Sequence, residues 1–560
     1  MKRSEKKITG STFTPPDLAR FIASRLLSGV EYEDKAYYIL EPSVGEGSLL
    51  EALLSQIPAF LHSRLVVHAY DINATSLQYC KKHFSELFPD VTIDFRHQDY
   101  ITELMNREEL ALFSRREEDS SYDFIIANPP YVRTQTMSKT YNQSKLRGFF
   151  GLEGRADLYH AFIVAISESL KEGGAAGIIV SNRFLNTKSG AAIRKYLATY
   201  PTIKEIIDLG DSKIFDAAVL PAILVLGKGN VAKSQMVDFL SIYEKTIEIN
   251  QPQRIEQLYD IFEKESGDYC IPDGRVFTYS KGKLKIDEEY EKPWVCDKHD
   301  DSEKKKSISR ATKNIFDDIF HCHVGIKTCA DKVFIRREWP ENIQREGLVL
   351  PLISHREAGQ YKAASKKTEL SVLYPYNLSE TRKTPVDISL FPETEEYLSQ
   401  HRSTLEGRKY LIEAHRKWYE HWVPHTPNEW RKRKIVFRDI AEIPQFWYDE
   451  EGCIVNGDCY WLTLKSGVSE EYIWLALAIA NSSFIEKFYD SNFNNKLYSG
   501  RRRFMQQYVK KFPLPDIQRD EAKEIIRLSQ EIYAEDNKTQ IVEKKERIEQ
   551  LLITIFGSFE

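Results

Sequence analysis

The chain has 560 residues and a formal net charge of −5, and this length indicates more than one domain. Its 78 basic and 83 acidic residues nearly balance, which excludes a uniformly basic coat protein and an acidic disordered chain. Seven cysteines make no disulfide framework in a chain this long. We find no secretory signal and no apolar run long enough to span a membrane, so we expect a reduced, cytoplasmic protein.

Strand-like and helix-like segments alternate along the first 230 residues. This alternation predicts an α/β fold with a doubly wound parallel sheet. No helix separates the last two strands, so we expect them to form an antiparallel hairpin at the sheet edge. The predicted strands are Tyr37–Leu40, Leu65–Tyr70, Val91–Phe95, Tyr122–Ala127, Ala175–Val180, Ile203–Leu209 and Val219–Leu226. The predicted helices are 15–27, 47–56, 74–87, 157–171 and 189–199.

The strand–helix alternation disappears after about residue 230. Residues 231–515 mix short strands, aromatic residues and charged loops, and residues 519–556 indicate one or two polar helices. The charge run at 297–306 predicts a solvated loop. The expected parts of the chain are residues 1–230, 231–515 and 516–560.

A glycine-containing loop, Glu41–Gly47 (EPSVGEG), follows the first predicted strand and precedes a helix. Glycine at positions 45 and 47 would let the backbone approach a ligand closely, because a Cβ atom would intrude. A lone GxG pattern is also typical of an ordinary strand–helix turn. The loop therefore needs support from other strand ends.

Acidic residues at the next two strand ends give that support. The second predicted strand ends at Asp71-Ile72, and the third leads to Asp99-Tyr100. A carboxylate at the second strand end of a nucleotide-binding sheet can accept hydrogen bonds from ribose hydroxyls. A carboxylate at the third can accept from an adenine amino group beside an aromatic ring. Together these positions indicate an adenosyl-containing ligand at the carboxyl edge of the sheet.

The strongest motif is Asn128-Pro129-Pro130-Tyr131, which follows the fourth predicted strand. Two prolines fix two φ angles and remove two N–H donors. The Asn128 side-chain oxygen and the Pro129 carbonyl remain as rigidly placed acceptors, which suit an amino group with two N–H hydrogens. Tyr131 adds a flat face for a ring. A simple proline-rich turn is the alternative.

These motifs, with the upstream Thr14-Pro15-Pro16, resemble the gamma-class, TaqI-like S-adenosylmethionine-dependent adenine-N6 DNA methyltransferases of type II restriction–modification systems. The order also matches: the TPP segment, the cofactor loop, the NPPY motif and then a long C-terminal region. The resemblance covers about residues 9–230. It implies a seven-stranded methyltransferase sheet with an edge hairpin in residues 1–230, a C-terminal α+β target-recognition domain in 231–515, and a helical segment in 516–560.

The resemblance also implies roles for individual residues. The methyl group of S-adenosylmethionine would pass to N6 of an adenine flipped out of duplex DNA, which protects host DNA. Phe215, between the last two strands, would pack on the flipped base; an ordinary hairpin residue is the alternative. The implied catalytic residues are Asn128, Pro129, Pro130, Tyr131 and Phe215. The implied cofactor-binding residues are Thr14, Pro15, Glu41, Pro42, Gly45, Gly47, Asp71, Ile72, Asp99 and Tyr100.

Candidate DNA contacts lie in the C-terminal region. The segment His321–Phe334 resembles the Gly-Ile-Lys-Thr-Gly-x-Asp-Lys segment of related target-recognition regions, with Cys329 where that segment often has glycine. The windows 431–438 and 493–511 carry five and six basic residues and no acid. Such windows indicate phosphate contacts or merely solvated faces. The candidate DNA-binding residues are Lys327, Arg431, Arg433, Lys496, Arg501, Arg502 and Arg503.

Other activities are less compatible with the motifs. The candidate zinc ligands His321, Cys322, His323 and Cys329 lack a second pair at zinc spacing, so we expect no metal. A nuclease-like Pro515-Asp516 has no correctly spaced partner. An RNA or protein-glutamine N-methyltransferase, which also uses NPPY, and a catalytically silent DNA-specificity component remain alternatives. We expect duplex DNA as the partner, a possible cognate restriction endonuclease, and a monomer.

Overall fold

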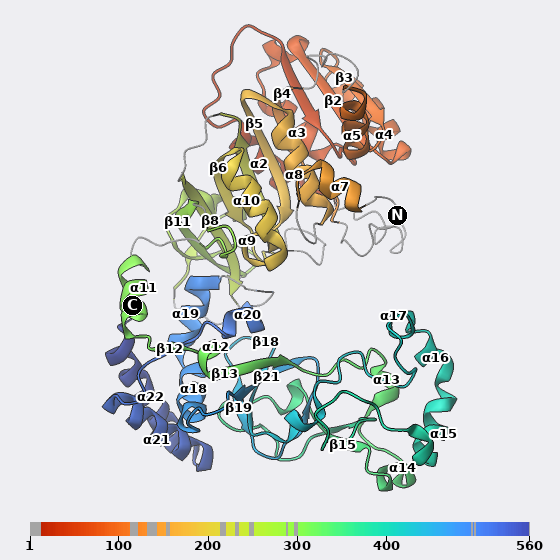
Figure 1. Cartoon of the computed structure of the whole chain (residues 1–560). Helices are drawn as coiled ribbons and strands as arrows, with labels where there is room; N and C mark the ends of the chain where they lie inside the picture. The colour runs from red at the N-terminus through yellow and green to blue at the C-terminus, as the bar shows by residue number, and fades with distance from the viewer. Residues whose placement is uncertain are drawn as a thin grey trace. The chain divides into compact units, whose positions relative to one another are not determined.

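The chain divides into two compact units in the computed structural model (Figure 1). Unit 1 contains residues 1–300 and 491–500, and unit 2 contains residues 301–490 and 501–560. The structure describes residues 13–111, 121–131, 143–152, 157–212, 220–229, 235–245, 251–286, 289–295, 301–493, 497 and 500–558.

The described part of unit 1 contains one eleven-stranded sheet, in the order β3-β2-β1-β4-β5-β7-β6-β8-β11-β10-β9. Strands β1 to β5 are parallel to one another, whereas β7 runs antiparallel between β5 and β6. The strands are β1 Tyr37–Glu41, β2 Leu65–Asp71, β3 Thr92–His97, β4 Tyr122–Ala127, β5 Leu170–Ser181, β6 Thr202–Asp208, β7 Pro221–Gly227, β8 Gln235–Lys245, β9 Gln253–Arg254, β10 Gly267–Cys270 and β11 Val276–Ile286.

Helices cover both faces of this sheet (Figure 1). Ile39 of β1 joins the apolar cluster that contains α2, α3 and α4, while its neighbour Leu40 joins the cluster of α5, α8 and α10. Successive strand residues point to opposite faces, so a strand buried on both faces is apolar throughout. The helices are α2 Pro16–Leu26, α3 Ser48–Gln56, α4 Ala74–Leu87, α5 Tyr100–Ala111, α7 Gln143–Phe149, α8 Leu158–Ser169, α9 Arg183–Asn186 and α10 Ala191–Thr199.

The structure corrects two expectations about this sheet. The hairpin of β6 and β7 is antiparallel as predicted, but it is not at the edge, because β8 pairs in parallel with β6. Strands β8 to β11 thereby extend the expected seven-stranded sheet to eleven strands. For the same reason the first compact unit continues to residue 300, beyond the predicted boundary at 230.

Unit 2 is built around two small sheets and a cluster of buried tryptophans. Trp430 and Trp461 lie with their ring centroids 4.6 Å apart in its apolar core. One sheet has the order β13-β21-β17-β19 and the other β14-β16-β15-β20, and two further strand pairs are β12-β23 and β18-β22. The strands are β12 Asn314–Ile315, β13 Phe320–Val324, β14 Ile335–Arg336, β15 Val349–Ile353, β16 Leu370–Leu373, β17 Lys434–Arg438, β18 Ile440–Ala441, β19 Phe446–Asp449, β20 Ile454–Val455, β21 Cys459–Leu464, β22 Arg502–Arg503 and β23 Pro513–Leu514.

The helices of unit 2 include two at the C-terminal end of the chain. In the predicted segment 516–560, α21 contacts both α22 and α18. The charge run predicted to be a loop instead contains a helix, α11, because its Glu and Lys residues are good helix formers. None of the described helices is long and apolar enough to cross a membrane. The helices are α11 Asp301–Ala311, α12 Phe316–Ile319, α13 Asp331–Phe334, α14 Glu341–Arg345, α15 Pro392–Gln400, α16 Arg402–Glu406, α17 Lys409–Glu413, α18 Glu471–Ala480, α19 Ser483–Phe493, α20 Gln506–Val509, α21 Asp520–Ala534 and α22 Lys538–Phe556.

Candidate functional site

The predicted motifs of unit 1 follow the carboxyl ends of β1, β2, β3 and β4. Strand β1 lies between β2 and β4, so the strand order reverses there. The helix that follows β1 covers one face of the sheet, and the helices that follow β4 cover the other. Loops that leave adjacent strands toward opposite faces open a crevice, which is where α/β sheets bind ligands.

Asp71 shapes the glycine-containing loop after β1. Its Oδ2 atom accepts a hydrogen bond from Gly45 N at 2.7 Å, and its Oδ1 atom accepts from Asn73 N at 2.7 Å. Gly45 and Gly47 both have left-handed backbone conformations, with φ of 54° and 85°. Only glycine adopts such angles without strain, so these two residues permit the turn from β1 into α3.

The two glycines differ in what a side chain would meet. A Cβ atom added to Gly47 would lie 2.5 Å from Cε2 of Phe84, whereas one added to Gly45 would meet nothing within 4 Å. We expect Gly47→Ala to lower the free energy of unfolding by about 2–4 kcal/mol, from overpacking and backbone strain together. Gly45→Ala should lower it by about 1 kcal/mol, from strain alone. Thermal unfolding of both variants tests this, and equal losses would contradict it.

Glu41, the last residue of β1, is a buried carboxylate. Only 1% of its surface is exposed, and Oε2 has no hydrogen-bond partner among the described residues. Burial and the nearby charge of Asp71 hold the pKa of Glu41 well above its ordinary value. A buried acceptor that lacks a donor is costly, so this atom fits a ligand that brings a charged amino group.

The other predicted cofactor residues are less uniform. Asp99 caps α5, because its Oδ2 atom accepts from Thr102 N at 3.1 Å. Tyr100 is buried in the core, where its hydroxyl lies 2.7 Å from Oγ of Ser169. Ile72 is 60% exposed beside Asp71 and can pack on a ligand ring.

Thr14 connects the TPP segment to both other motifs. Its Oγ1 atom accepts a hydrogen bond from Nδ2 of Asn128 at 3.0 Å, and its carbonyl accepts from Oγ of Ser48 at 2.8 Å. Oγ of Ser43 donates to the carbonyl of Asn128 at 3.2 Å. Three segments far apart in sequence therefore meet at Asn128. Because its amide nitrogen faces Thr14, its side-chain oxygen points away from Thr14.

The prolines of the motifs hold these segments in place. Pro15 is the residue before α2, Pro42 is buried directly after β1, and Pro129 is buried after Asn128. Pro130 is half-buried. The structure therefore places four of the five predicted catalytic residues and all predicted cofactor residues around one edge of the sheet. The fifth, Phe215, lies outside the described residues.

Tyr131 completes the NPPY motif. Its hydroxyl is buried, and among the described residues it has no hydrogen-bond partner, while burial raises its pKa. On α8, the neighbouring residues Tyr159 and His160 are also buried. Burial lowers the pKa of His160 to about 4, so its imidazole is neutral at physiological pH.

The sequence motifs did not indicate several residues of the site. Ser43 and Ser48 flank the predicted glycine loop, and their proximity to it was the one available indication. His160 lies in an almost wholly apolar helix, where a single histidine is no evidence of a site. Only the fold brings Ser43 to Asn128 and Ser48 to Thr14. His160 likewise becomes a candidate only once the fold places α8 in this unit.

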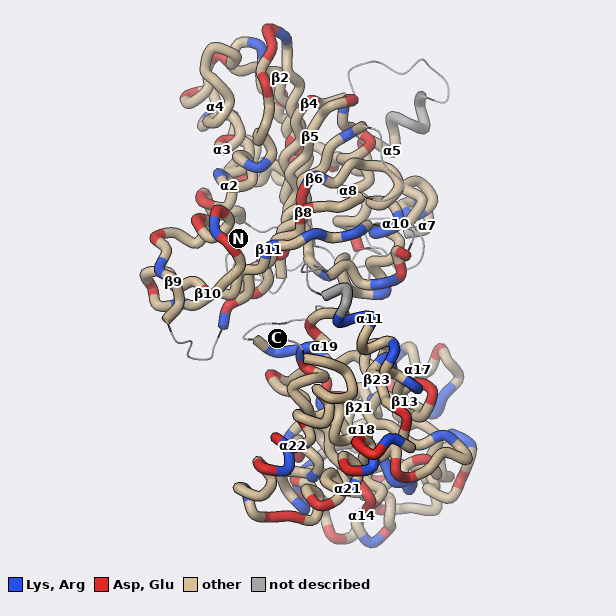
Figure 2. Tube along the Cα trace, turned by 90° about the vertical axis from the view of Figure 1, so that its left-hand side faces the viewer, with Lys and Arg blue, Asp and Glu red and all other residues tan. Residues whose placement is uncertain are grey.

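The described residues among the seven predicted DNA-binding cations fall into two groups, the first of which forms ion pairs. Figure 2 shows basic and acidic residues interspersed along this unit. Three of the seven candidates have carboxylate partners, and Lys496 lies outside the described residues. The pairs are Arg433 Nη1–Glu470 Oε2 at 3.1 Å, Arg502 Nε–Asp490 Oδ1 at 2.7 Å and Arg503 Nη2–Asp439 Oδ2 at 3.1 Å.

The second group is available for other partners. Lys327, Arg431 and Arg501 are exposed, and none of them forms an ion pair with a described residue. Exposed cations without carboxylate partners are the ones that can contact phosphates. The windows 431–438 and 493–511 therefore contain more basic residues than they contain cations available for phosphate contacts.

Lys327 belongs to a tight turn whose glycine has a structural reason. A Cβ atom on Gly325 would lie 1.8 Å from the backbone oxygen of Asn456. Cys329, which stands where related segments often have glycine, adopts the left-handed conformation with φ of 54°. The turn thus forms in this chain in spite of the cysteine.

The close approach at Gly325 predicts a severe substitution. We expect Gly325→Ala to lower the free energy of unfolding of unit 2 by about 3 kcal/mol or more, because the backbone at Asn456, directly after β20, would have to move. Gly467, with φ of 80° and nothing within 4 Å of an added Cβ, provides the control. Gly467→Ala should cost about 1 kcal/mol. Similar denaturant midpoints for the two variants would refute this explanation.

Comparisons with known proteins give matches in both units. Residues 51–215 match the Eco57I restriction-modification methylase family, and residues 379–514 match the TaqI-like C-terminal specificity domain. The type II methyltransferase M.BanIII of Aneurinibacillus aneurinilyticus is 34% identical, over 99% of this chain and 98% of that protein. M.BstVI of Geobacillus stearothermophilus is 23% identical, over 91% and 90% of the two chains.

A solved structure resembles the whole chain. The type IIL restriction-modification enzyme MmeI, solved in complex with DNA, aligns with 100% of this chain and 77% of its own, with a TM-score of 0.58 and 11% identity. At this identity the likeness concerns the fold alone.

Proposed function

Because the chain belongs to the type II DNA methyltransferases of restriction–modification systems, which use S-adenosylmethionine, we propose that it methylates N6 of adenine at a specific site in duplex DNA. The observation that carries this proposal is the rigid Asn128–Tyr131 segment at the end of β4. The hydrogen bond from Asn128 Nδ2 to Thr14 orients the amide. Its oxygen is thereby presented as an acceptor.

The proposed role of this segment is to prepare a weak nucleophile. The lone pair of an adenine amino group is delocalised into the ring. Asn128 Oδ1 and the Pro129 carbonyl accept the two N6 hydrogens, which localises the lone pair toward the methyl donor. S-adenosylmethionine would supply a methyl group on a sulfonium, which leaves as the neutral thioether S-adenosylhomocysteine. The methylated amine is very acidic and would lose one N6 proton to water. The acceptors act through position and electrostatics, in a geometry that the prolines fix in advance.

The target adenine must leave the double helix, because N6 in a base pair cannot reach this pocket. Tyr131 offers a ring face beside Asn128, and we assign stacking on the flipped base to it. Phe215 keeps the same proposed role. The buried hydroxyl of Tyr131 has no partner among the described residues, which leaves it available to the substrate.

The cofactor site is proposed to be the crevice after β1 and β2. Glu41 would accept the ammonium group, since its Oε2 atom is buried and lacks a described donor. Asp71 would accept from ribose hydroxyls beside Ile72, Asp99 would accept from the adenine amino group, and Thr14 with Pro15 would cover the methionine end. Gly45 leaves open space on this side of the loop.

Target recognition is assigned to unit 2, which contains the match to the TaqI-like specificity domain. This assignment moves the proposed start of the recognition region from residue 231 to about residue 301. A chain that carries catalysis and recognition together can act as a monomer. A cognate restriction endonuclease would be a functional partner that cuts the unmethylated site.

Analysis of the methylated product tests the proposal. The protein is incubated with tritiated S-adenosylmethionine and, in separate reactions, duplex DNA, RNA and a protein mixture, and labelled nucleosides are separated. We expect label in N6-methyladenine from DNA alone. Label in RNA or glutamine would favour the alternative methyltransferases, and cofactor binding without product on any DNA would favour a silent specificity component.

A further inference from the structure

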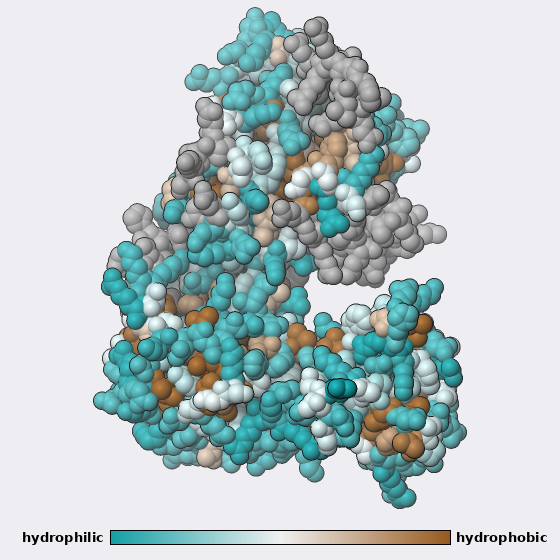
Figure 3. All heavy atoms as spheres, viewed as in Figure 1, coloured by the Kyte–Doolittle hydropathy of each residue, from teal (hydrophilic) through white to brown (hydrophobic). Residues whose placement is uncertain are grey.

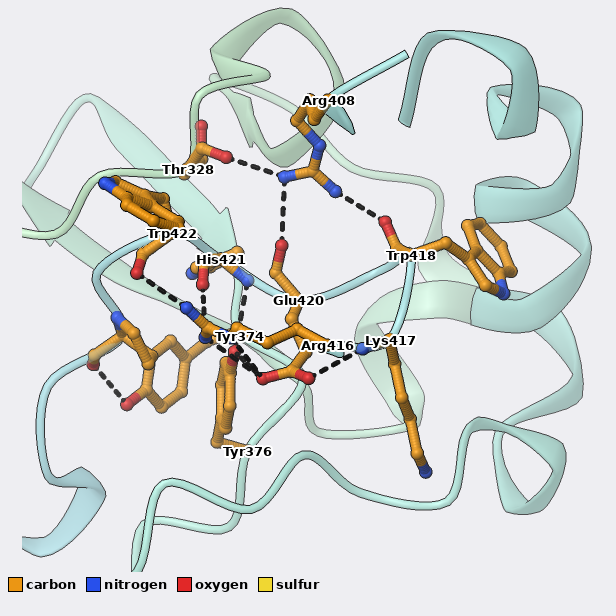
Figure 4. A network of polar contacts seen from close by, with 11 residues as sticks. Thr328, Tyr374, Tyr376, Arg408, Arg416, Lys417, Trp418, Glu420, His421 and Trp422 are labelled. Atoms are coloured by element: carbon orange, nitrogen blue, oxygen red, sulfur yellow. Dashed lines mark hydrogen bonds and ion pairs between the residues drawn. The ribbon is translucent and has the colours of Figure 1, made fainter. Parts of the chain in front are cut away.

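Residues 415–425 form a loop of unit 2 without regular secondary structure. Hydrogen bonds from two arginines hold this loop (Figure 4). Arg408 is buried, and no carboxylate of a described residue pairs with its guanidinium. It donates instead to the carbonyl oxygens of Thr328 at 2.7 Å, Glu420 at 2.9 Å and Trp418 at 2.5 Å. Burying a charge is costly unless it is fully hydrogen-bonded. The three hydrogen bonds offset this cost, and they fix the backbone of loop 415–425.

A second arginine fixes the same loop from within. Arg416 donates through Nε and Nη2 to Oε2 of Glu420 at 3.1 and 3.0 Å, and through Nη1 to the carbonyl of Trp422 at 2.8 Å. Oε1 of Glu420 accepts from Lys417 N at 2.8 Å. His421 is buried, and its Nε2 lies 3.0 Å from the carbonyl of Leu373. The fork between Arg416 and Glu420 neutralises this acid.

The ends of loop 415–425 are strained and tied to the Gly325–Cys329 turn. His415 and His425 have φ of 54° and 61°, a region that side chains other than glycine rarely adopt. Backbone strain of this kind persists where surrounding contacts over-determine it, and it clusters at functional sites. Val423 and Lys327 exchange two backbone hydrogen bonds, of 3.0 and 3.2 Å. The loop and the turn therefore form one rigid surface.

This rigid surface presents two aromatic rings to solvent. Trp422 and Tyr410 are each 39% exposed, and their rings meet edge to face with centroids 4.9 Å apart. Ile412, on the same short helix α17 as Tyr410, is 45% exposed. Figure 3 shows apolar surface at the end of unit 2 where Figure 1 places α17. We call Tyr410, Ile412 and Trp422 the aromatic patch.

The charge around the aromatic patch points to a polyanion. Residues 408–425 contain four basic side chains and two acidic ones. Arg416 and Glu420 pair with each other, and Arg408 is buried. The exposed charges that remain are Lys409, Lys417 and Glu413. Lys327 and Lys409 are exposed, and neither has an ion pair with a described residue. On duplex DNA, cations contact phosphates, while rigid apolar or aromatic side chains contact base edges in a groove or wedge between base steps.

We propose that the aromatic patch is a contact surface for duplex DNA at the target site, with Trp422 and Tyr410 packing against bases and Lys327 and Lys409 contacting phosphates. The proposal rests on the DNA substrate assigned above and names the surface of unit 2 that meets it. In this proposal the buried Arg408 and the partly exposed Arg416 are positioning residues, since their hydrogen bonds hold the loop.

Binding of the full-length protein to a labelled duplex that contains the site methylated by the wild type tests the proposal. We expect Trp422→Ala to raise the Kd about 10-fold or more, in line with the loss of one contact to a base. Trp422→Phe should recover most of that loss. Tyr200→Ala removes a 65% exposed tyrosine that also belongs to an aromatic pair, on unit 1, and should leave the Kd unchanged.

Two further measurements distinguish a loss of the DNA contact from unfolding of the variant. S-adenosylmethionine binding and the melting temperature should be the same in Trp422→Ala and the wild type, which shows that the variant is folded. A wild-type Kd in this folded variant would overturn the inference. So would loss of self-association in sedimentation with DNA binding intact, because the patch would then meet a second copy. If the wild type itself fails to bind or methylate duplex DNA, the proposed function falls first.

Discussion

Replacing Asn128 with alanine is expected to lower the rate of methyl transfer to DNA by about 10³-fold or more. Preorganised groups aimed at the reacting atom typically contribute factors of 10²–10³ each, and Asn128 would supply one of the two acceptors for the N6 hydrogens. Its hydrogen bond to Thr14 would also be lost. Single-turnover methylation of the target duplex measures the effect without interference from product release.

The same variant provides its own control through the cofactor. Glu41, Gly45 and Asp71 are untouched by the substitution, so calorimetry should find S-adenosylmethionine affinity within about threefold of the wild type. Removing Ser43, which donates to the backbone carbonyl of Asn128, should cost about 10-fold or less, since it acts only through the backbone. Undiminished turnover by Asn128→Ala would reject the assignment of this motif as catalytic.

Replacing Glu41 with glutamine is expected to weaken S-adenosylmethionine binding by about 10- to 100-fold, the value of one hydrogen bond between charged groups. Burial and Asp71 raise the pKa of Glu41 in the free protein, whereas a bound ammonium group would favour the carboxylate. Cofactor binding by the wild type should therefore release a proton and strengthen as the pH rises through that raised pKa. The glutamine variant should lose this pH dependence.

The stability of the cofactor-free protein should change in the opposite direction. A carboxyl whose pKa is raised by folding stabilises the fold at low pH, and this contribution is lost as the pH rises toward the folded pKa. Glu41→Gln should therefore be at least as stable as the wild type at neutral pH. The exposed Glu46, in the same loop, is the matched control, and Glu46→Gln should alter neither property. Unchanged affinity in Glu41→Gln would remove Glu41 from the cofactor site.

The order of elements in the first 227 residues could be predicted because it depends on local patterns. Strand β4 is apolar along Phe124–Ala127, as a strand buried on both faces must be, and proline ends it. The parallel pairing of β8 with β6 could not be predicted in this way. In this pairing Ile206 lies opposite Phe239, for example. Nothing in the sequence around either residue indicates which strand it pairs with.

The residues of the candidate site also divide into those that could be predicted from the sequence and those that could not. Strand-end residues such as Asp71 and Asn128 could be found, because topology alone brings successive strand ends to one edge. The bond between Asn128 and Thr14 spans 114 positions and depends on where α2 packs. The basic windows were overestimated for the same reason: the acid that pairs with Arg503 is Asp439, 64 positions away, which a count within a window cannot include.

The methylation pattern of cellular DNA shows whether this chain methylates adenine at a specific site. DNA from cells that lack other adenine methylation, but express the wild-type protein, is sequenced by a method that detects N6-methyladenine. Modified adenines should recur in one short sequence, and cells expressing Asn128→Ala at the same level should contain none. Absence of N6-methyladenine with the wild type, or modification of cytosine instead, would contradict the account.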